Sequence, residues 1–328
     1  MLKRPRRNRK STSIRRLVQE IVLTTDDLVY PLFLIDGKNI KEEISSLPGN
    51  YRFSLDQMRL EIKSAVSLGL HSFMIFPKIA DRHKDKLATY SYSKDNYYLN
   101  AITELKSAFP DITLISDVAM DPYNVDGHDG IVQDGKILND ASIEVLVKMS
   151  IAQAKAGFDI LGPSDMMDGR VRAMREALDS EGYSDTSVMS YTAKYASAYY
   201  GPFRDALDSA PIDNADIPKD KKTYQMNPGN KREALIEGAL DEQEGADFLM
   251  VKPALNYLDI IHIMKENFNL PIAAYHVSGE CAMLIAACQN GWLEYEQAMP
   301  ETLLSLKRAG TDVIISYFAK DYAKMVNG

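Results

Sequence analysis

The chain has 328 residues, of which 45% are hydrophobic and 26% are charged, and its net charge is −8. This composition is typical of a folded globular protein with enough apolar mass for a large core. No run of about 18 apolar residues occurs, so we expect no membrane span and no membrane partner. The first residues also lack the apolar stretch of a signal peptide, and we expect a cytoplasmic protein.

The first segment of the chain, residues 1–16, holds eight basic residues and no acidic one, so the rest of the chain carries −16. A basic tail on an acidic body can bind nucleic acid. It can equally wrap around an acidic neighbouring copy of the chain. The segment has no interleaved aromatic residues, and the body offers no basic face that would continue a phosphate track. We therefore predict that residues 1–25 form an oligomerisation arm, with no nucleic-acid partner.

Eight short apolar runs follow the arm, and each is rich in strand-forming residues. They are residues 28–34, 72–76, 112–118, 158–161, 188–191, 248–251, 272–276 and 313–318. Amphipathic stretches that favour helices lie between them, at 54–68, 142–156, 231–244 and 257–267. Gly157 and Gly310 are among the glycines that follow such stretches, where a left-handed residue closes a helix.

Eight alternating strand and helix units predict a (β/α)8 TIM barrel covering residues 26–328. A doubly wound open sheet is the alternative. The glycine-rich fingerprint expected after its first strand is missing, because residues 31–38 read PLFLIDGK. The segment 199–231 interrupts the pattern, because it is long, polar and rich in Pro, Asp and Lys. A loop of that length is typical of an active-site lid.

Chemistry in a barrel lies where the strands end, at their carboxyl sides. Lys252 follows a fully apolar strand, and Lys194 follows the strand before it. Burial and a neighbouring cation both lower the pKa of an amine, and the neutral amine is the form that attacks a ketone. We therefore predict that Lys252 and Lys194 form Schiff bases with a carbonyl substrate. A pair of structural salt bridges is the alternative.

Two further sets of side chains suit the carboxylates of keto acids. Arg204, Lys221 and Gln225, in the predicted lid, provide a guanidinium fork, an ammonium and an amide donor. Ser278 and Tyr317 provide hydroxyl donors at the last two strand ends. The sequence therefore predicts a site for one keto acid or two.

The loop that follows the third predicted strand, residues 117–130, reads DVAMDPYNVDGHDG. Its carboxylates and histidine could bind a hard cation, or could serve the turns of the loop. The pattern leaves both open. The chain has two cysteines, Cys281 and Cys288. Their number excludes a four-cysteine zinc site, and we expect two buried free thiols.

The chain resembles the δ-aminolevulinic acid dehydratase (porphobilinogen synthase) family through long phrases that run in family order over nearly its whole length. They include KSTSIRRLVQE, DLVYPLFL, SDVAMDPYNVDGHDG, GPSDMMDGRVRAMREAL, MSYTAKYAS, YYGPFRDA, KTYQMNPGN, EGADFLMVKPALNYLDI, AAYHVSGE and ISYFAKDY. The resemblance implies a lyase that condenses two 5-aminolevulinate molecules to porphobilinogen with loss of two waters, in haem and chlorophyll biosynthesis. It also implies a barrel, an N-terminal arm and a homo-octamer.

By position, the resemblance assigns Lys252 to the Schiff base of the propionate-side substrate and Lys194 to that of the acetate-side substrate. It implies that Ser278 and Tyr317, with Tyr275 nearby, bind the propionate-side carboxylate. The acetate-side carboxylate then falls to the lid, and two polar residues face the reacting substrates. These residues are Arg204, Lys221 and Gln225 in the lid, and Asp117 and Ser164 facing the substrates.

The chain departs from the family's zinc-using members, which carry three cysteines where this chain has Ala119, Asp121 and Asp129. Zinc prefers thiolate and imidazole ligands, so we expect no catalytic zinc. The chain is similar to aspartate-rich members, which use Mg²⁺ away from the active site at the position of Glu237. Asp121 and Asp129 stay open as additional cation ligands.

Two other functions are compatible with part of these features. A class I aldolase would explain Lys252 but would leave Lys194 and the second carboxylate site unused. A basic-armed RNA-binding or scaffold protein would explain residues 1–16 alone. Formation of a pyrrole from 5-aminolevulinate separates the predicted lyase from both.

Overall fold

The computed structural model describes residues 1–208, 214 and 216–328. Eight parallel strands of the described chain form a closed barrel, and each strand lies beside the next one along the chain. They are β1 (Leu28–Ile35), β4 (Ser72–Lys78), β5 (Thr113–Ile115), β8 (Ile160–Leu161), β9 (Ser187–Lys194), β10 (Phe248–Lys252), β11 (Ile272–His276) and β12 (Val313–Ser316). The last strand, β12, pairs with β1 and closes the ring. The predicted (β/α)8 barrel is confirmed.

All eight predicted strands are present, and the two largest changes at their ends, of three residues each, occur in β9 and β5. β9 runs three residues beyond the predicted end and includes Lys194, because these residues pair with β10 although Thr192 is polar. β5 stops at Ile115, three residues early, and Val118 makes a single bridge to Pro163 instead of continuing the strand. Both changes occur on the carboxyl side of the barrel, where the chain turns into the loops.

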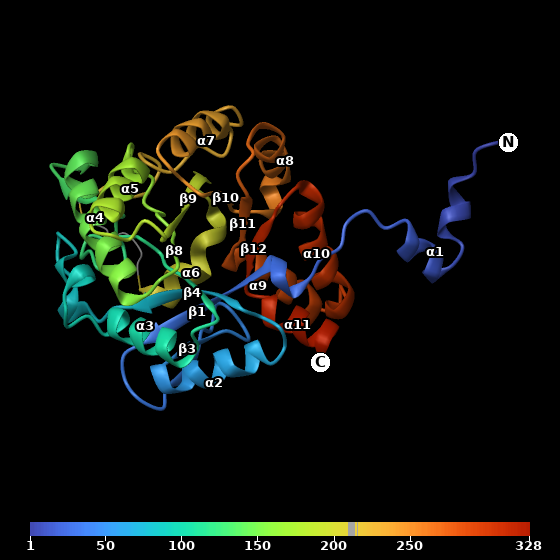
Figure 1. Cartoon of the computed structure of the whole chain (residues 1–328), viewed down its shortest axis with the longest axis horizontal. Helices are drawn as coiled ribbons and strands as arrows, with labels where there is room; N and C mark the ends of the chain where they lie inside the picture. Colours follow the sequence, from blue (N-terminus) through green and yellow to red (C-terminus); the bar gives the residue numbers. More distant parts are fainter. Residues whose placement is uncertain (209–213, 215) are drawn as a thin grey trace.

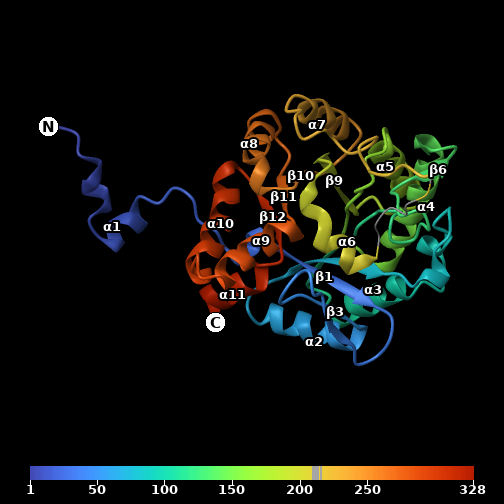
Figure 2. The ribbon, with the colours of Figure 1, turned by 180° about the vertical axis from the view of Figure 1, so that it is seen from behind.

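Helices surround the barrel, as Figures 1 and 2 show from opposite sides. They are α2 (Leu55–Val66), α3 (Tyr97–Ala108), α4 (Asn139–Ala156), α5 (Arg170–Ser180), α6 (Gly201–Leu207), α7 (Glu233–Gln243), α8 (Leu258–Asn267), α9 (Ser278–Gln289), α10 (Tyr295–Ala309) and α11 (Ala319–Asn327). A further helix, α1 (Thr12–Leu17), lies apart from the barrel on the N-terminal segment. The four helices predicted from amphipathic stretches correspond to α2, α4, α7 and α8. Gly157 and Gly310 end α4 and α10 with φ of 107° and 118°, the left-handed conformation that the sequence predicts there.

The barrel strands are buried on both faces, because side chains fill the interior and helices cover the outside. Phe33 and Phe76, on adjacent strands, have ring centroids 5.8 Å apart. Short strands lie at the rim of the barrel: β2 (Lys41–Glu43) pairs with β3 (Tyr51–Phe53), and β6 (Ile131–Gln133) pairs with β7 (Lys136–Leu138). The β6–β7 hairpin follows the Asp-rich loop and so lies on the carboxyl side.

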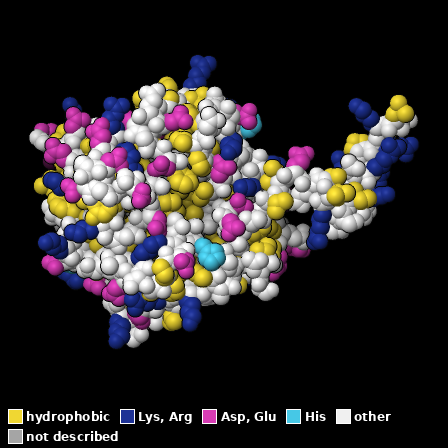
Figure 3. Space-filling view, in the orientation of Figure 1, with side chains coloured by type: hydrophobic (Ala, Val, Ile, Leu, Met, Phe, Trp, Pro, Cys, Tyr) yellow, Lys and Arg dark blue, Asp and Glu magenta, His cyan; other side chains and the backbone are white. Residues whose placement is uncertain are grey.

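The N-terminal segment stands away from the barrel (Figure 1). Its helix α1 begins at the Ser11 N-cap, whose side chain accepts a hydrogen bond from the Ile14 amide, and has no buried residue. Figure 3 shows its lysines and arginines projecting from the segment. Within the described residues, no helix is both long and apolar enough to cross a membrane.

The segment predicted to be a polar lid begins with a helix, because residues Gly201–Leu207 form α6. Pro202 lies in the first turn of this helix, where a proline costs no hydrogen bond. Residues 209–213 and 215, which are part of the predicted lid, lie outside the described residues. The remaining residues, 216–231, run over the carboxyl side of the barrel, and Met226 makes a bridge to Tyr195 just after β9.

Candidate active site

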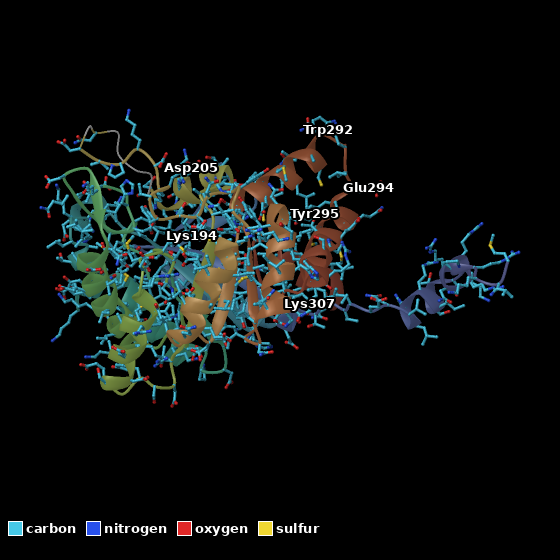
Figure 4. All side chains as sticks on the ribbon, turned by 90° about the horizontal axis from the view of Figure 1, so that it is seen from above. Lys194, Asp205, Trp292, Glu294, Tyr295 and Lys307 are labelled. Atoms are coloured by element: carbon cyan, nitrogen blue, oxygen red, sulfur yellow. The ribbon has the colours of Figure 1, made fainter. Side chains whose placement is uncertain are left out.

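The two predicted Schiff-base lysines end two adjacent strands. Lys252 is the last residue of β10, Lys194 is the last residue of β9, and the two are direct partners in the register of these strands. Each is only 6% exposed. Figure 4 shows Lys194 within the barrel, with Asp205 of α6 above it. The fold therefore brings together two amines from residues 58 positions apart in the sequence.

Aromatic rings surround the amine of Lys252. Its Nζ lies 4.3 to 5.5 Å from four ring centroids, which belong to Tyr275, Tyr191, Phe203 and Tyr200. Burial among these rings lowers the pKa of Lys252, the Lys194 ammonium lowers it further, and the resulting pKa is about 7. Asp117 opposes the shift. An amine with this pKa is half neutral at neutral pH, which suits a nucleophile.

The amine of Lys194 has a different environment, since it donates a hydrogen bond to the backbone carbonyl of Ser164. The positive charges of Lys252 and Lys194 both lower the pKa of Asp117. Burial outweighs both effects and raises the pKa of Asp117 to about 6. Its Oδ1 is buried and has no hydrogen-bond partner among the described residues, which leaves it available to a substrate.

Lys221, in the predicted lid, lies between two aspartates. Its Nζ is 2.8 Å from Asp129 Oδ2 and 3.1 Å from Asp121 Oδ2. Burial acts to lower the pKa of Lys221, but the two carboxylates outweigh burial and raise it. Burial raises the pKa of Asp121, while Lys221 overcomes burial at Asp129 and lowers the pKa of Asp129 to about 2. The aspartates considered as cation ligands thus hold an ammonium group.

The other two predicted carboxylate-binding residues of the lid lie in different parts of it: Gln225 follows Lys221 closely, and Arg204 belongs to α6. Gln225 is buried, and its Oε1 lacks a hydrogen-bond partner among the described residues. The backbone N–H of Gln225 donates a hydrogen bond to the backbone carbonyl of Lys221, so the two residues share one turn of the lid. Arg204 is half-buried on α6. Phe203, beside it, places its ring over Lys252, so α6 covers the lysine.

The predicted propionate-side residues come together near Lys252, whose Nζ lies 4.3 Å from the centroid of the Tyr275 ring. Tyr275 Oη and Tyr317 Oη are 3.1 Å apart. Ser278 is the first residue of α9, and its Oγ accepts a hydrogen bond from the Phe203 amide at 3.0 Å. All three side chains are buried. They offer three hydroxyl groups within a small region next to the aromatic rings around Lys252.

Glu237 lies apart from the lysines, on α7. Burial raises its pKa to about 7, against the effect of Arg170. It lines a cavity of about 570 Å³ that also contacts Asp168, Glu233 and Gln225. Neither lysine is among the described residues that line this cavity. In the described part of the chain, no cluster of three or more His, Cys, Asp or Glu residues is arranged to hold a metal.

Sequence reasoning missed the buried network behind β9. Arg170 Nη2 donates to Ser190 Oγ at 3.0 Å and to the Tyr191 carbonyl at 3.3 Å. Ser190 in turn donates to Asp241 Oδ2 at 2.7 Å. This network fixes β9 just before Lys194. A single arginine at the start of a helix gives no periodic signal, so the sequence could not have assigned it this role.

The sequence also gave no role to Tyr191, Tyr200 and Phe203, whose rings surround Lys252. Tyr191 lies in an apolar strand, so the sequence indicated only a core residue.

The two cysteines differ slightly from the expectation of two buried free thiols. Both are free, but Cys281 is buried and Cys288 is only half-buried.

Comparison with known proteins supports one family. The family model described as "Delta-aminolevulinic acid dehydratase" matches residues 2–325. A protein of that name from Chlamydia pneumoniae is 52% identical over 97% of this chain and 94% of its own length. One from Halalkalibacterium halodurans is 47% identical over 99% of this chain and 97% of its own.

A solved structure extends the comparison to the fold. The delta-aminolevulinic acid dehydratase (porphobilinogen synthase) of Toxoplasma gondii, in complex with the reaction product porphobilinogen, is 49% identical. It covers 99% of this chain, this chain covers 92% of it, and the TM-score is 0.96. The chain therefore belongs to the delta-aminolevulinic acid dehydratase family.

Proposed function

We propose that this chain condenses two molecules of 5-aminolevulinate to porphobilinogen with Lys252 and Lys194 as the two Schiff-base amines. The reaction follows from family membership, which makes the chain a lyase of tetrapyrrole biosynthesis. The residue roles rest on one observation above all: the two lysines are register partners at the carboxyl ends of β9 and β10. One amine per ketone is the requirement of a reaction that activates two keto acids.

The proposed chemistry begins at Lys252. Its neutral amine adds to the ketone of one substrate, and loss of water gives an imine. Lys194 forms the second imine in the same way, and this imine acidifies the neighbouring carbon. A carbon–carbon bond and a carbon–nitrogen bond then form between the substrates. The carbon–carbon bond forms when the carbon next to the Lys194 imine attacks the Lys252 imine carbon, which leaves Lys252 attached as an amine. The carbon–nitrogen bond forms when the amino group of the Lys252-bound substrate displaces Lys194 from its carbon. Elimination of the Lys252 amine together with a proton of the new ring, and transfer of a second ring proton, complete the pyrrole and release both lysines.

The carboxylates of the two substrates have separate proposed partners. Ser278, Tyr275 and Tyr317 bind the propionate-side carboxylate through their hydroxyl groups, and this set is supported by their proximity to Lys252. Arg204, Lys221 and Gln225 bind the acetate-side carboxylate. Lys221 must then share its ammonium between the substrate and the two aspartates. Asp117 and Ser164 face the reacting atoms between the lysines.

The first test is the product. Purified protein with 5-aminolevulinate should form a pyrrole that gives a colour with Ehrlich's reagent, and Lys252→Ala should form none. Colour in the Lys252→Ala variant equal to that of the wild type would contradict the assignment of the nucleophile.

We also propose that the chain is a magnesium-type member with no catalytic zinc, in which Glu237 holds Mg²⁺ away from the lysines. The donor set fits this ion, because Mg²⁺ prefers oxygen ligands and keeps several waters. Glu237, Glu233 and Asp168 line the same cavity, which has room for the waters of the ion, although within the described residues the three carboxylates are not gathered into one ligand cluster. At the position of the family's zinc cysteines, Asp121 and Asp129 hold the Lys221 ammonium, and no thiolate is present. The ion would stabilise the active conformation.

A chelator experiment tests the metal. Activity should fall when a chelator is added and return with Mg²⁺ but not with Zn²⁺. The Glu237→Ala variant should lose the response to Mg²⁺, whereas Glu242→Ala, an exposed residue of the same helix, should keep it. An equal Mg²⁺ response in wild type and Glu237→Ala would remove Glu237 from the proposal.

The proposed role of residues 1–25 is to join copies of the chain into a homo-octamer in the cytoplasm, with residues 26–328 as the catalytic barrel. The support is the concentration of positive charge on an exposed segment (Figure 3) together with an acidic body. Removal of residues 1–16 should reduce the mass in light scattering. If the mass stays the same and salt-sensitive RNA binding is lost instead, the segment is a nucleic-acid tail.

A further inference from the structure

Three buried polar side chains outside the reacting centre form a cluster between the barrel and α9. His276 and Ser316 are register partners at the carboxyl ends of β11 and β12. His276 Nδ1 lies 3.0 Å from Ser316 Oγ and 3.2 Å from Cys281 Sγ. All three residues are fully buried. No step of the proposed reaction uses any of them.

The cluster touches each element that carries a proposed propionate-side residue. Tyr275 precedes His276 in the chain, Tyr317 follows Ser316, and Cys281 lies one turn after Ser278 on α9. Neighbouring residues of a strand point to opposite faces, so Tyr275 faces the barrel interior where His276 faces the helix layer. Tyr317 directly follows β12, and its hydroxyl contacts that of Tyr275 at 3.1 Å. The His276 ring packs against Phe318 at a centroid distance of 5.3 Å, which closes the cluster from the other end.

The hydrogen bonds of the cluster define how it is held. The Phe318 amide donates to Ser316 Oγ at 3.2 Å, so the serine hydroxyl has its proton free to donate to His276 Nδ1. Burial lowers the pKa of His276 to about 3 and raises the pKa of the Cys281 thiol. Both groups are therefore uncharged at neutral pH. The single lone pair of His276 Nδ1 accepts the Ser316 hydroxyl proton, and the Cys281 thiol contacts the same nitrogen, so the cluster fixes geometry and transfers no proton.

We propose that His276, Ser316 and Cys281 are positioning residues that hold Tyr275, Tyr317 and Ser278 in register to bind a substrate carboxylate. This inference rests on the proposed carboxylate role of those three hydroxyl residues. It assigns a function to buried groups that touch neither substrate nor lysine. The cluster joins β11, β12 and α9 at one point, so its loss should change the relative placement of the three hydroxyl groups.

The test compares two substitutions of the same histidine. His276→Phe keeps a ring but removes the acceptor, whereas His276→Asn places a polar atom near the position of Nδ1 and keeps the acceptor. We expect His276→Phe to raise KM for 5-aminolevulinate roughly tenfold with kcat changed by less than about threefold, and His276→Asn to recover most of that loss. Cys288→Ala, on the same helix but outside the cluster, is the matched control and should match the wild type.

A smaller change covers the case in which His276→Phe does not fold. Ser316→Ala removes one oxygen atom and should also raise KM. If KM is unchanged in folded His276→Phe and Ser316→Ala while the melting temperature falls, the cluster is only structural and the inference is overturned. Equal KM values for the Phe and Asn variants would overturn it too.

Tyr317→Phe, measured in parallel, separates the inference from the proposal beneath it. A raised KM in Tyr317→Phe with wild-type KM in the cluster variants removes only the positioning role. A wild-type KM in Tyr317→Phe itself removes the carboxylate assignment, and the positioning inference with it.

Discussion

Lys252 and Lys221 are both buried lysines at the carboxyl side of the barrel, yet their surroundings drive their pKa values in opposite directions. Aromatic rings surround Lys252, and its pKa falls to about 7 because of burial and then the Lys194 ammonium. Two aspartates contact Lys221, and their charges raise its pKa despite burial. Lys252 therefore suits the nucleophile role that we propose for it, whereas the two aspartates keep Lys221 in its ammonium form.

Burial alone therefore does not make a lysine a nucleophile. A buried ammonium without a counter-ion loses its proton, whereas one with carboxylate partners keeps it. Lys252 has no carboxylate within ion-pair distance among the described residues, since Asp117 and the two aspartates act on it only from further away. The distribution of carboxylates between the two lysines therefore supports the different roles that we propose for them.

The largest expected difference is in turnover. Lys252→Met should reduce kcat by more than about a thousandfold, because no other group replaces the imine at that position. Lys221→Met should leave measurable kcat and raise KM, because an ammonium that binds a carboxylate takes no part in bond formation. Steady-state kinetics on both variants checks this. A Lys221→Met variant as inactive as Lys252→Met would contradict the proposal that Lys221 only binds a carboxylate.

The second difference is in stability. Lys221→Met leaves two buried carboxylates without their cation and should lower the free energy of unfolding by about 3–5 kcal/mol. Lys252→Met removes an amine that has no ion-pair partner and should leave stability unchanged or increase it. Urea unfolding of the two variants measures both values. Equal destabilisation would show that Lys252 has a counter-ion in solution.

The third difference is in pH dependence. Lys252 must be neutral to react, so kcat/KM should rise with pH and level off above about 7, the pKa of this amine. The Asp117 carboxylate favours the ammonium form of Lys252, so Asp117→Asn should move the inflection to lower pH by less than about one unit. The proposed position of Asp117 beside the substrates predicts that absolute rates of this variant also fall, but the pH of the inflection can still be measured. A shift of the inflection to higher pH would contradict the expected effect of Asp117 on the pKa of Lys252.

The fold could be predicted from the sequence because its signals are local. Each barrel strand is a short apolar run, and several helices, among them α4 and α10, are followed by a glycine. The same signals placed Lys252 and Lys194 at strand ends, and the barrel model then required adjacent strands to bring them together. The start of the lid was harder, because Gly201 and Pro202 suggest a turn although Pro202 belongs to the first turn of α6.

The pairing within the site could not be predicted in the same way. Asp121 and Asp129 were recognised as possible cation partners and Lys221 as an anion partner, but nothing local indicates that they contact one another across about a hundred residues. The aromatic rings around Lys252 could not be predicted for a similar reason, since Phe203 and Tyr191 come from separate elements and each resembles an ordinary core residue. The roles of all these side chains in binding and catalysis stay predictions.

The most direct test of the central claim is to trap the imine. The protein is incubated with 5-aminolevulinate, reduced with borohydride, digested and examined by mass spectrometry. We predict a reduced substrate adduct on the peptide that contains Lys252, and none on the peptide that contains Lys221. No modified lysine, or an adduct on Lys221 in place of Lys252, would contradict the account.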